Sequence, residues 1–274
     1  MRKVIDSSML QSAELHEYLD ASASNHAVLP DFVSMEAYKV GSVERILERW
    51  QVISQFPKQV IILKGTSQIC GLRGRAKGLQ QRLIDHRQTR DFPEFCEGLK
   101  LVRAGNDRYS RALLKLGAAG KEEIDKLLAL VPVVIENRRA LVSGYTEEER
   151  RAIRGGKAPP DSLKAKFVRN VMELTSLMFR GHPSVSSAPA NFEDLCNRYI
   201  FRFALTVHVW LMDWVVDGCM DGSNLERVRN DFVDLNVATY ATYFDGPIAA
   251  DSKLLHVYAV SGLLLNGIRG RESP

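Results

Sequence analysis

The chain begins with MRKVIDSSML (1–10), and PIAAD (247–251) lies near its other end. Each stretch predicts a short buried strand that ends on an aspartate, Asp6 in the first and Asp251 in the second. The β-branched apolar run QVIILK (59–64) predicts another buried strand. Strands at both ends of a chain with helices between them predict a parallel sheet that is assembled from distant segments.

Helical signals occupy most of the remaining chain. In LPDFVSMEAYK (29–39), a proline followed by Asp31 predicts a helix start, and this helix should continue past Glu36 into ERILERW (44–50). Thr146 and Glu149 have the spacing of a capping box.

These signals predict an α/β fold in which a small parallel β-sheet is flanked by helices and carries a large all-helical insertion. The first part of the core should span 1–95, the helical insertion 96–224, and the second part of the core 225–274.

The composition is that of an ordinary globular protein. It has 274 residues, of which 45% are hydrophobic and 26% are charged, and a net charge of +4. This charge is too small to indicate nucleic-acid binding by itself, so such an argument needs local patches. The four scattered cysteines form no CxxC pair, and we expect them to be reduced and partly buried.

The sequence predicts neither a signal peptide nor a membrane span. No apolar run precedes Asp6, so a signal peptide is not expected. The most apolar stretch, 199–216, is interrupted by Arg202, His208 and Asp213, and we interpret it as a buried helix rather than a membrane span. A cytoplasmic protein is therefore expected.

Several acidic residues are positioned where they could meet. In open parallel sheets, ligand sites lie beyond the carboxyl ends of the strands, so Asp6 and Asp251 should point into one crevice. Glu36 lies in the first turns of the helix that follows Pro30. Asp231 and Asp234 are three residues apart and share one face of a predicted helix.

These segments resemble the PIN-domain nucleases. IDSSML (5–10) matches the family's first strand, LPDFVSMEAYK its second acidic segment, and DLNVATYATYFDGPIAAD (234–251) its last two. The resemblance covers about 1–70 and 225–268 but not the long helical middle, and Ala249 stands where the family often has Ser or Thr.

The resemblance implies a divalent-metal-dependent nuclease that hydrolyses phosphodiester bonds. Its catalytic and metal-binding residues would be Asp6, Glu36, Asp234 and Asp251, with Asp231 as an accessory metal ligand. Crowded carboxylates need a cation, and Mg²⁺ or Mn²⁺ prefers oxygen ligands and can activate water. RNA is favoured over DNA as the substrate, and a toxin or defence nuclease fits by analogy.

Simpler interpretations of the same residues remain open. Asp6 and Asp251 could be strand-end residues or helix caps, and Glu36 could be a solvated helix residue. Ser8 could orient a metal-bound water or cap the next helix. The alternative function is a catalytically degenerate PIN-like module that binds nucleic acid or a protein partner without cutting.

One stretch of the chain, GLRGRAKGLQQRLIDHRQTR (71–90), has a dense excess of positive charge. An acidic site repels its own substrate, so a nearby cationic surface should hold the nucleic-acid backbone. We therefore predict that nucleic acid contacts Arg73, Arg75, Lys77 and Arg82, with a solvated helix face as the alternative. A homo-oligomer or an inhibitory protein partner would also fit the family resemblance.

Overall fold

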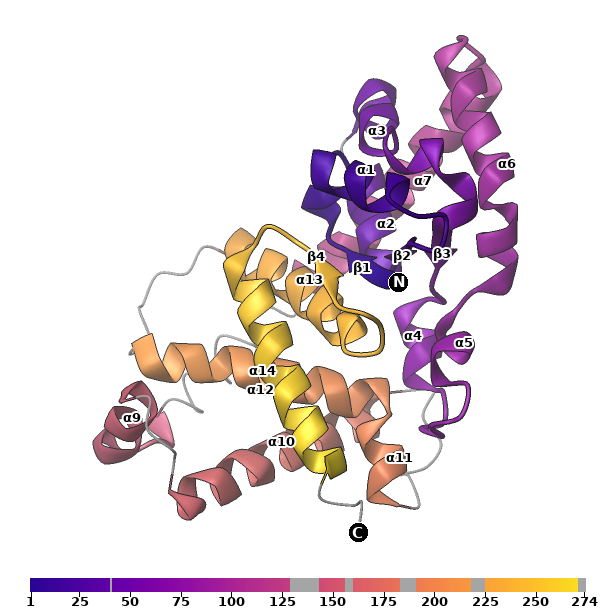
Figure 1. Ribbon diagram of the computed structural model, residues 1–274. Helices are drawn as coiled ribbons and strands as arrows, with labels where there is room; N and C mark the ends of the chain where they lie inside the picture. The colour runs from indigo at the N-terminus through magenta and orange to yellow at the C-terminus, as the bar shows by residue number, and fades with distance from the viewer. Residues whose placement is uncertain (40, 129–142, 156–159, 183–190, 218–224, 271–274) are drawn as a thin grey trace.

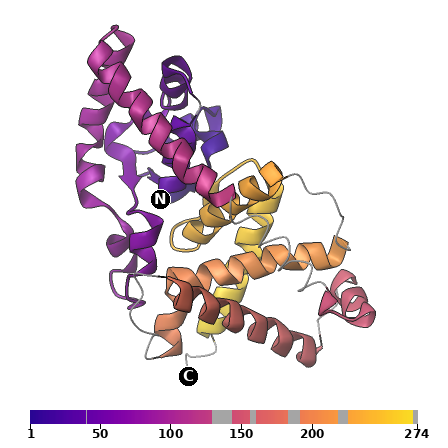
Figure 2. The same cartoon turned by 180° about the vertical axis from the view of Figure 1, so that it is seen from behind.

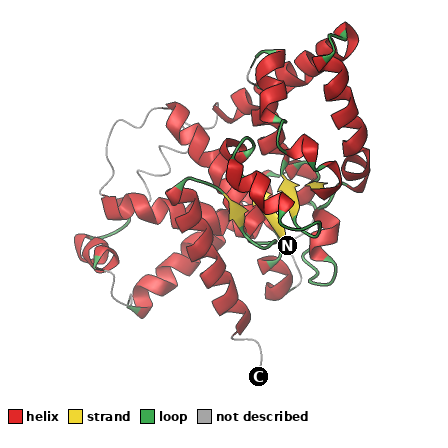
Figure 3. Cartoon of the chain, turned by 45° about the horizontal axis from the view of Figure 1, so that its top comes forward, coloured by secondary structure: helices red, strands yellow, loops and turns green. Residues whose placement is uncertain are grey.

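The structure is a computed structural model that describes residues 1–39, 41–128, 143–155, 160–182, 191–217 and 225–270. A four-stranded sheet lies in the middle of the molecule, and helices surround it (Figures 1 and 3). The strands are β1 Arg2–Ile5, β2 His26–Leu29, β3 Val60–Ile62 and β4 Pro247–Ile248.

Helices account for most of the described chain. The α-helices are α1 Ala13–Asp20, α2 Asp31–Tyr38, α3 Val43–Arg49, α4 Thr66–Cys70, α5 Leu79–Leu83, α6 His86–Arg103, α7 Asp107–Leu128, α9 Glu147–Arg154, α10 Asp161–Gly181, α11 Phe192–Cys196, α12 Tyr199–Asp217, α13 Leu225–Ala241 and α14 Ser252–Gly270. The short 3₁₀ helices are η1 Ser7–Met9, η2 Ile53–Gln55 and η3 Pro57–Gln59.

All strand pairs in the sheet are parallel, and the strand order is β3-β2-β1-β4. Val4 in β1 pairs with Val28 in β2 on one side and with Pro247 in β4 on the other. The first strand of the chain therefore lies beside the last. The predicted parallel sheet of distant segments is confirmed.

The local sequence explains several helix ends. Ser12 accepts a hydrogen bond from Leu15 N at the start of α1, and Thr146 forms the predicted capping box with Glu149 at the start of α9. The predicted long helix from Asp31 to residue 50 is wrong, because the chain divides it into α2 and α3. Gly41, with φ 80°, lies in this break, in a conformation that a helix cannot continue through.

The helical middle of the chain is divided differently from the prediction. The boundary at 95–96 falls inside the continuous helix α6. Helix α7 runs beside α6 and packs against α2 next to the sheet (Figure 2). Helices α6 and α7, which cover the start of the expected insertion, therefore pack beside the sheet and α2.

Helices from the rest of the middle pack on the C-terminal helices. Helix α12 contacts α10, α13 and α14. Residues 199–216 are long and apolar enough to cross a membrane by length and composition, which corrects the expectation that Arg202, His208 and Asp213 exclude this. In the structure 67% of that segment is buried, as in the core helix of a soluble protein.

The cysteines agree with the sequence-based expectation as far as they are described. Cys70 and Cys96 are buried free thiols, and Cys196 is buried as well. Burial raises the pKa of Cys70 to about 12 and that of Cys96 to about 11. Cys219 lies outside the described residues.

A polar network joins the carboxyl ends of β2 and β3 to α13. The Asp31 carboxylate accepts hydrogen bonds from Phe32 N at 2.9 Å, Thr66 N at 2.6 Å and Thr66 Oγ1 at 2.7 Å. Thr66 Oγ1 also lies 2.8 Å from the Tyr240 hydroxyl. Burial raises the pKa of Asp31, and these hydrogen bonds oppose that rise because they favour the ionised form.

Replacing Asp31 with Ala should lower the free energy of unfolding by roughly 2–3 kcal/mol, because the half-buried Thr66 groups lose a charged acceptor. Asp31→Asn keeps an oxygen acceptor and should cost less. Urea unfolding measures both variants, with Asp20→Ala on the exposed surface of α1 as the control. Equal stability of Asp31→Ala and Asp20→Ala would contradict this role.

Candidate functional site

The four acidic residues expected at the site line one cavity. Asp6 follows β1, Glu36 lies on α2, Asp234 lies on α13, and Asp251 lies between β4 and α14. Their common cavity has a volume of about 580 Å³. It lies at the carboxyl edge of the sheet, where parallel strands commonly place ligand sites.

Asp6 is held at the end of β1 by the backbone and by a neighbouring serine. Its N–H donates to Ile248 O at 3.0 Å, which joins it to the adjacent strand β4. The Ser8 hydroxyl donates to Asp6 Oδ2, so Ser8 orients this carboxylate and also lines the cavity. Burial raises the pKa of Asp6 above its usual range, the hydrogen bond from Ser8 opposes this, and the charge of Glu36 adds to the rise.

Asp234 has the most strongly perturbed carboxyl group in this cavity. Burial raises its pKa to about 8, and the charges of Asp6, Asp251, Asp231 and Glu36 contribute to the rise in that order. The acids predicted from the sequence therefore lie near enough to interact electrostatically. At neutral pH this carboxyl retains a proton unless a cation offsets the neighbouring charges.

Protein donors also occupy the carboxylates of Glu36 and Asp251. Glu36 accepts a hydrogen bond from the Ser7 hydroxyl at 2.6 Å and forms an ion pair with Lys39. Asp251 caps α14 by accepting hydrogen bonds from Lys253 N at 2.8 Å and Leu254 N at 2.9 Å. The cap predicted as the simpler role of Asp251 is therefore present, and it does not remove this residue from the cavity wall.

The four acids share the cavity without forming a compact cluster. Within the described residues, no group of three or more His, Cys, Asp or Glu side chains is close enough to hold a metal ion as it stands. The sequence predicted carboxyl groups close enough to share a cation. In the described residues, no three of them are that close. Mutual repulsion among carboxylates favours such separation when protein donors are available instead.

Asp231 does not line this cavity. Its carboxylate forms an ion pair with Lys253 at 2.8 Å, and the Lys253 ammonium lies 5.3 Å from the ring centre of Trp210 and 5.5 Å from that of Trp214. Asp231 on α13 therefore faces Lys253 on α14 rather than this cavity, and its role as an accessory ligand stays a prediction. The charge of Asp231 contributes to the raised pKa of Asp234.

Three cations that the sequence analysis did not single out line the same cavity. They are Lys39 after α2, Arg49 at the end of α3, and Arg229 on α13. Arg49 Nη1 donates to Ser7 O at 3.3 Å, next to Asp6. No spacing in the sequence links these positions, because only the fold brings α2, α3 and α13 to one wall.

The basic stretch is not part of this cavity. Gln80 accepts a hydrogen bond from Arg2 Nη1 at 3.2 Å and donates one to Tyr243 O at 2.6 Å. Arg2 begins β1, and Tyr243 precedes β4, so this segment lies at the amino edge of the sheet. The expectation that Arg73, Arg75, Lys77 and Arg82 adjoin the acidic site is wrong, since Asp6 and Asp251 lie at the opposite ends of the same strands.

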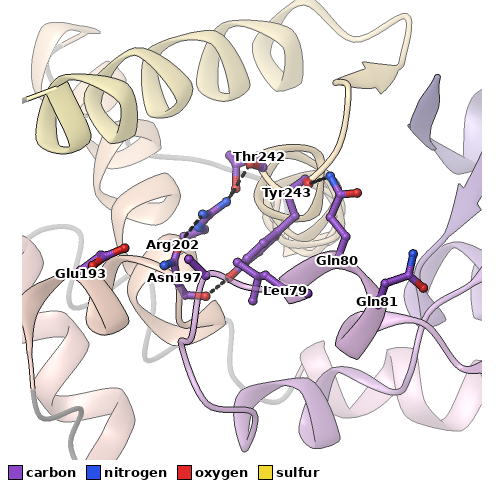
Figure 4. A pocket seen from close by; sticks show the side chains of 10 residues that line it. Leu79, Gln80, Gln81, Glu193, Asn197, Arg202, Thr242 and Tyr243 are labelled. Atoms are coloured by element: carbon purple, nitrogen blue, oxygen red, sulfur yellow. Dashed lines mark hydrogen bonds between the residues drawn. The ribbon is translucent and has the colours of Figure 1, made fainter. Parts of the chain in front are cut away.

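A larger cavity, of about 720 Å³, lies beside the basic stretch (Figure 4). Gln80, Gln81 and Asn197 contribute amide groups to its wall, with Glu193 as an acidic group. This cavity contains none of the carboxylates that resemble the nuclease motif. The smaller cavity at the carboxyl edge is therefore the candidate for phosphodiester chemistry.

Comparison of the chain with protein-family models, with curated proteins and with solved structures gives no match in any of the three.

The protonation of Asp234 should make stability depend on pH. A carboxyl whose folded pKa is raised binds a proton that the unfolded chain has released, so its stabilising contribution is complete below about pH 4 and is lost as pH rises to about 8. Without divalent cations, Asp234→Asn should flatten the fall of the unfolding free energy by up to about 1.4 kcal/mol per pH unit.

Urea unfolding between about pH 4 and pH 8 measures this slope. Asp20→Asn, on the exposed surface of α1, serves as the matched control and should keep the wild-type slope. If Asp234→Asn keeps that slope as well, Asp234 is not the protonated group.

Proposed function

We propose that this protein is a divalent-metal-dependent nuclease with a PIN-like core, and that it hydrolyses phosphodiester bonds in RNA in preference to DNA. The observation that carries the proposal is the common cavity of Asp6, Glu36, Asp234 and Asp251. These residues come from segments spread over the whole chain. Four acids from four separate elements at the carboxyl edge of a parallel sheet are difficult to explain by packing alone.

The donor chemistry of the cavity fits Mg²⁺ or Mn²⁺. All four acids offer oxygen ligands, and the raised pKa of Asp234 to about 8 reflects buried negative charge that a divalent cation would offset. When bound, such an ion would supply Lewis acidity toward a phosphate oxygen and would lower the pKa of water. Asp6, Glu36, Asp234 and Asp251 would hold it after Glu36 releases Lys39 and Ser7.

The chain's other groups in the cavity suit a phosphate substrate. Ser8 orients Asp6, and Ser7 orients Glu36. Arg49 and Arg229 place positive charge on the wall that also carries the acids, so a phosphate could bind there without facing carboxylates alone. One cavity thus offers carboxylates for a cation and guanidinium groups for a phosphate.

A second candidate function is a PIN-like module that binds nucleic acid without cutting it. The ion pair of Lys39 with Glu36 favours this alternative, since an internal ammonium already occupies one of the four carboxylates. If this pair persists with substrate bound, the cavity can accept a phosphate but not a metal.

Replacing Asp6 or Asp251 with Asn should lower the rate of RNA cleavage in Mg²⁺ or Mn²⁺ at least about a hundredfold, because an amide is a poorer metal ligand than a carboxylate. Even the loss of a residue that only hydrogen-bonds to a metal ligand can lower activity by up to about a hundredfold. Excess EDTA should abolish cleavage by the wild type. Gel assays on labelled RNA and DNA strands measure both effects.

Asp20→Asn is the matched control and should cleave as the wild type does. Circular dichroism should show that all variants remain folded. Full activity of Asp6→Asn, or of the wild type in excess EDTA, would contradict metal-dependent cleavage. A wild type that binds RNA but cuts no RNA or DNA would favour the binding module.

A further inference from the structure

Residues 73–78 of the basic stretch form a braced loop, whereas Arg82, Arg87 and Arg90 lie on helices. Residues 73–78 precede the short helix α5, and the Arg82 guanidinium on α5 donates hydrogen bonds to the backbone oxygens of Arg73, Arg75 and Lys77. The side chains of these last three residues are exposed. Arg82 thus fixes the loop backbone and leaves three cations exposed to solvent. Because the backbone is already ordered, a ligand loses less binding free energy to ordering the loop.

The loop is also anchored to α11 and to Arg198, which directly precedes α12. Arg198 Nη1 donates to Leu72 O at 2.7 Å. Gly74 lies so close to α11 that a Cβ would be 1.7 Å from the Asp194 carbonyl oxygen, which makes glycine necessary there. The three cations are therefore presented from a rigid position between the two halves of the molecule.

The cavity of about 720 Å³ opens directly beside this loop, and Ala76 and Gly78 form part of its wall. Gln80, Asn197, Arg202, Thr242 and Tyr243 lie around it with Glu193 and Gln81 (Figure 4). The Arg202 guanidinium lies 3.8 Å from the centre of the Tyr243 ring and donates to Thr242 O at 2.7 Å. The wall therefore combines neutral hydrogen-bonding groups with an acid and a fixed cation.

We propose that the loop and this cavity form a binding site for single-stranded nucleic acid at the amino edge of the sheet, remote from the acidic cavity. The phosphates contact Arg73, Arg75 and Lys77, and an unpaired base enters the cavity. This proposal rests on the proposed function in that the bound strand is the substrate of the acidic cavity.

The charges decide which part of the ligand lies where. On the cavity wall the charge of Glu193 offsets that of Arg202, so a phosphate is attracted more strongly by the three exposed cations of the loop outside the cavity. A base edge carries both donors and acceptors, which amides such as Gln81 and a carboxylate can match. A base in a duplex must unpair and unstack before it can enter the cavity, whereas a base in a single strand is already unpaired. Single strands should therefore bind more tightly than duplexes.

The position of the site sets a requirement on substrate length. β1, with Arg2 at one end and Asp6 just beyond the other, separates the two edges by about 13 Å at the usual rise of a strand. A nucleic-acid strand that occupies both the loop site and the acidic cavity must span at least this distance. At about 3.4 Å per nucleotide, this requires several nucleotides. Longer strands should therefore bind much more tightly than a dinucleotide.

The test replaces Arg73, Arg75 and Lys77 with Glu and measures binding of a labelled single-stranded RNA by fluorescence anisotropy in EDTA at several salt concentrations. Loss of three phosphate contacts should reduce the slope of log affinity against log salt by about 2 and weaken binding about a hundredfold near 0.1 M salt. The neutral variant with Gln at the same three positions should show a smaller loss in the same direction.

The matched control is charge reversal of Arg108, Arg111 and Lys115, which are exposed on α7. It should leave the affinity and the salt slope as in the wild type. Wild-type affinity of the loop variant, or an equal loss in the control, would overturn the proposal. Equal binding of the duplex form of the same sequence would overturn the entry of an unpaired base.

Cleavage separates this proposal from the proposed function. With a long strand, the loop variant should require more substrate for half-maximal rate, whereas cleavage of a dinucleotide should be unchanged. If the wild type cuts nothing but loses binding when the loop is reversed, the nuclease proposal fails and the binding site stands. If cleavage persists and both affinity and substrate requirement are unchanged in the loop variant, the remote site fails and the nuclease proposal stands.

Discussion

The parallel pairing of β1 with β4 is the interaction on which the rest of this structure depends. Val4 N donates to Gly246 O at 2.9 Å, and Asp6 N donates to Ile248 O at 3.0 Å. This pairing brings segments from the two ends of the chain together in the sheet, so that Asp6, directly after β1, and Asp251, between β4 and α14, line one cavity. At the amino edge of the sheet, the same pairing places Tyr243, before β4, next to Arg2, and Gln80 forms hydrogen bonds to both residues.

The same pairing concentrates negative charge at one place. Burial and neighbouring acids raise the pKa of Asp234 to about 8, while Lys39 and Ser7 hold Glu36. The cavity thus balances its charge with a proton and an internal cation. A divalent ion would compete with both, so metal binding, proton release and movement of Lys39 would be coupled.

The sequence contained most of the acidic site but little of its surroundings. RKVID predicted the strand that Asp6 directly follows, because a β-branched run that stops at a carboxylate is a local pattern. PIAAD also predicted a strand, but β4 ends at Ile248, and Asp251 instead caps α14. Arg49 carries no such pattern, since its place on the cavity wall depends on the turn at Gly41 that separates α3 from α2. The basic stretch was placed at the wrong edge because contacts between Gln80 and Arg2 cannot be inferred from charge density.

The proposed nuclease activity requires that the acidic cavity binds a divalent cation. Titration with Mn²⁺ at about pH 8, followed by electron paramagnetic resonance, measures this binding directly and without any substrate. The wild type should bind Mn²⁺ saturably, and Asp234→Asn should weaken binding at least about tenfold, because the carboxyl group with the most strongly raised pKa in the cavity is replaced by a neutral amide. Asp20→Asn should bind as the wild type does. Absence of saturable binding by the wild type up to millimolar Mn²⁺, or equal affinity in Asp234→Asn, would contradict the account.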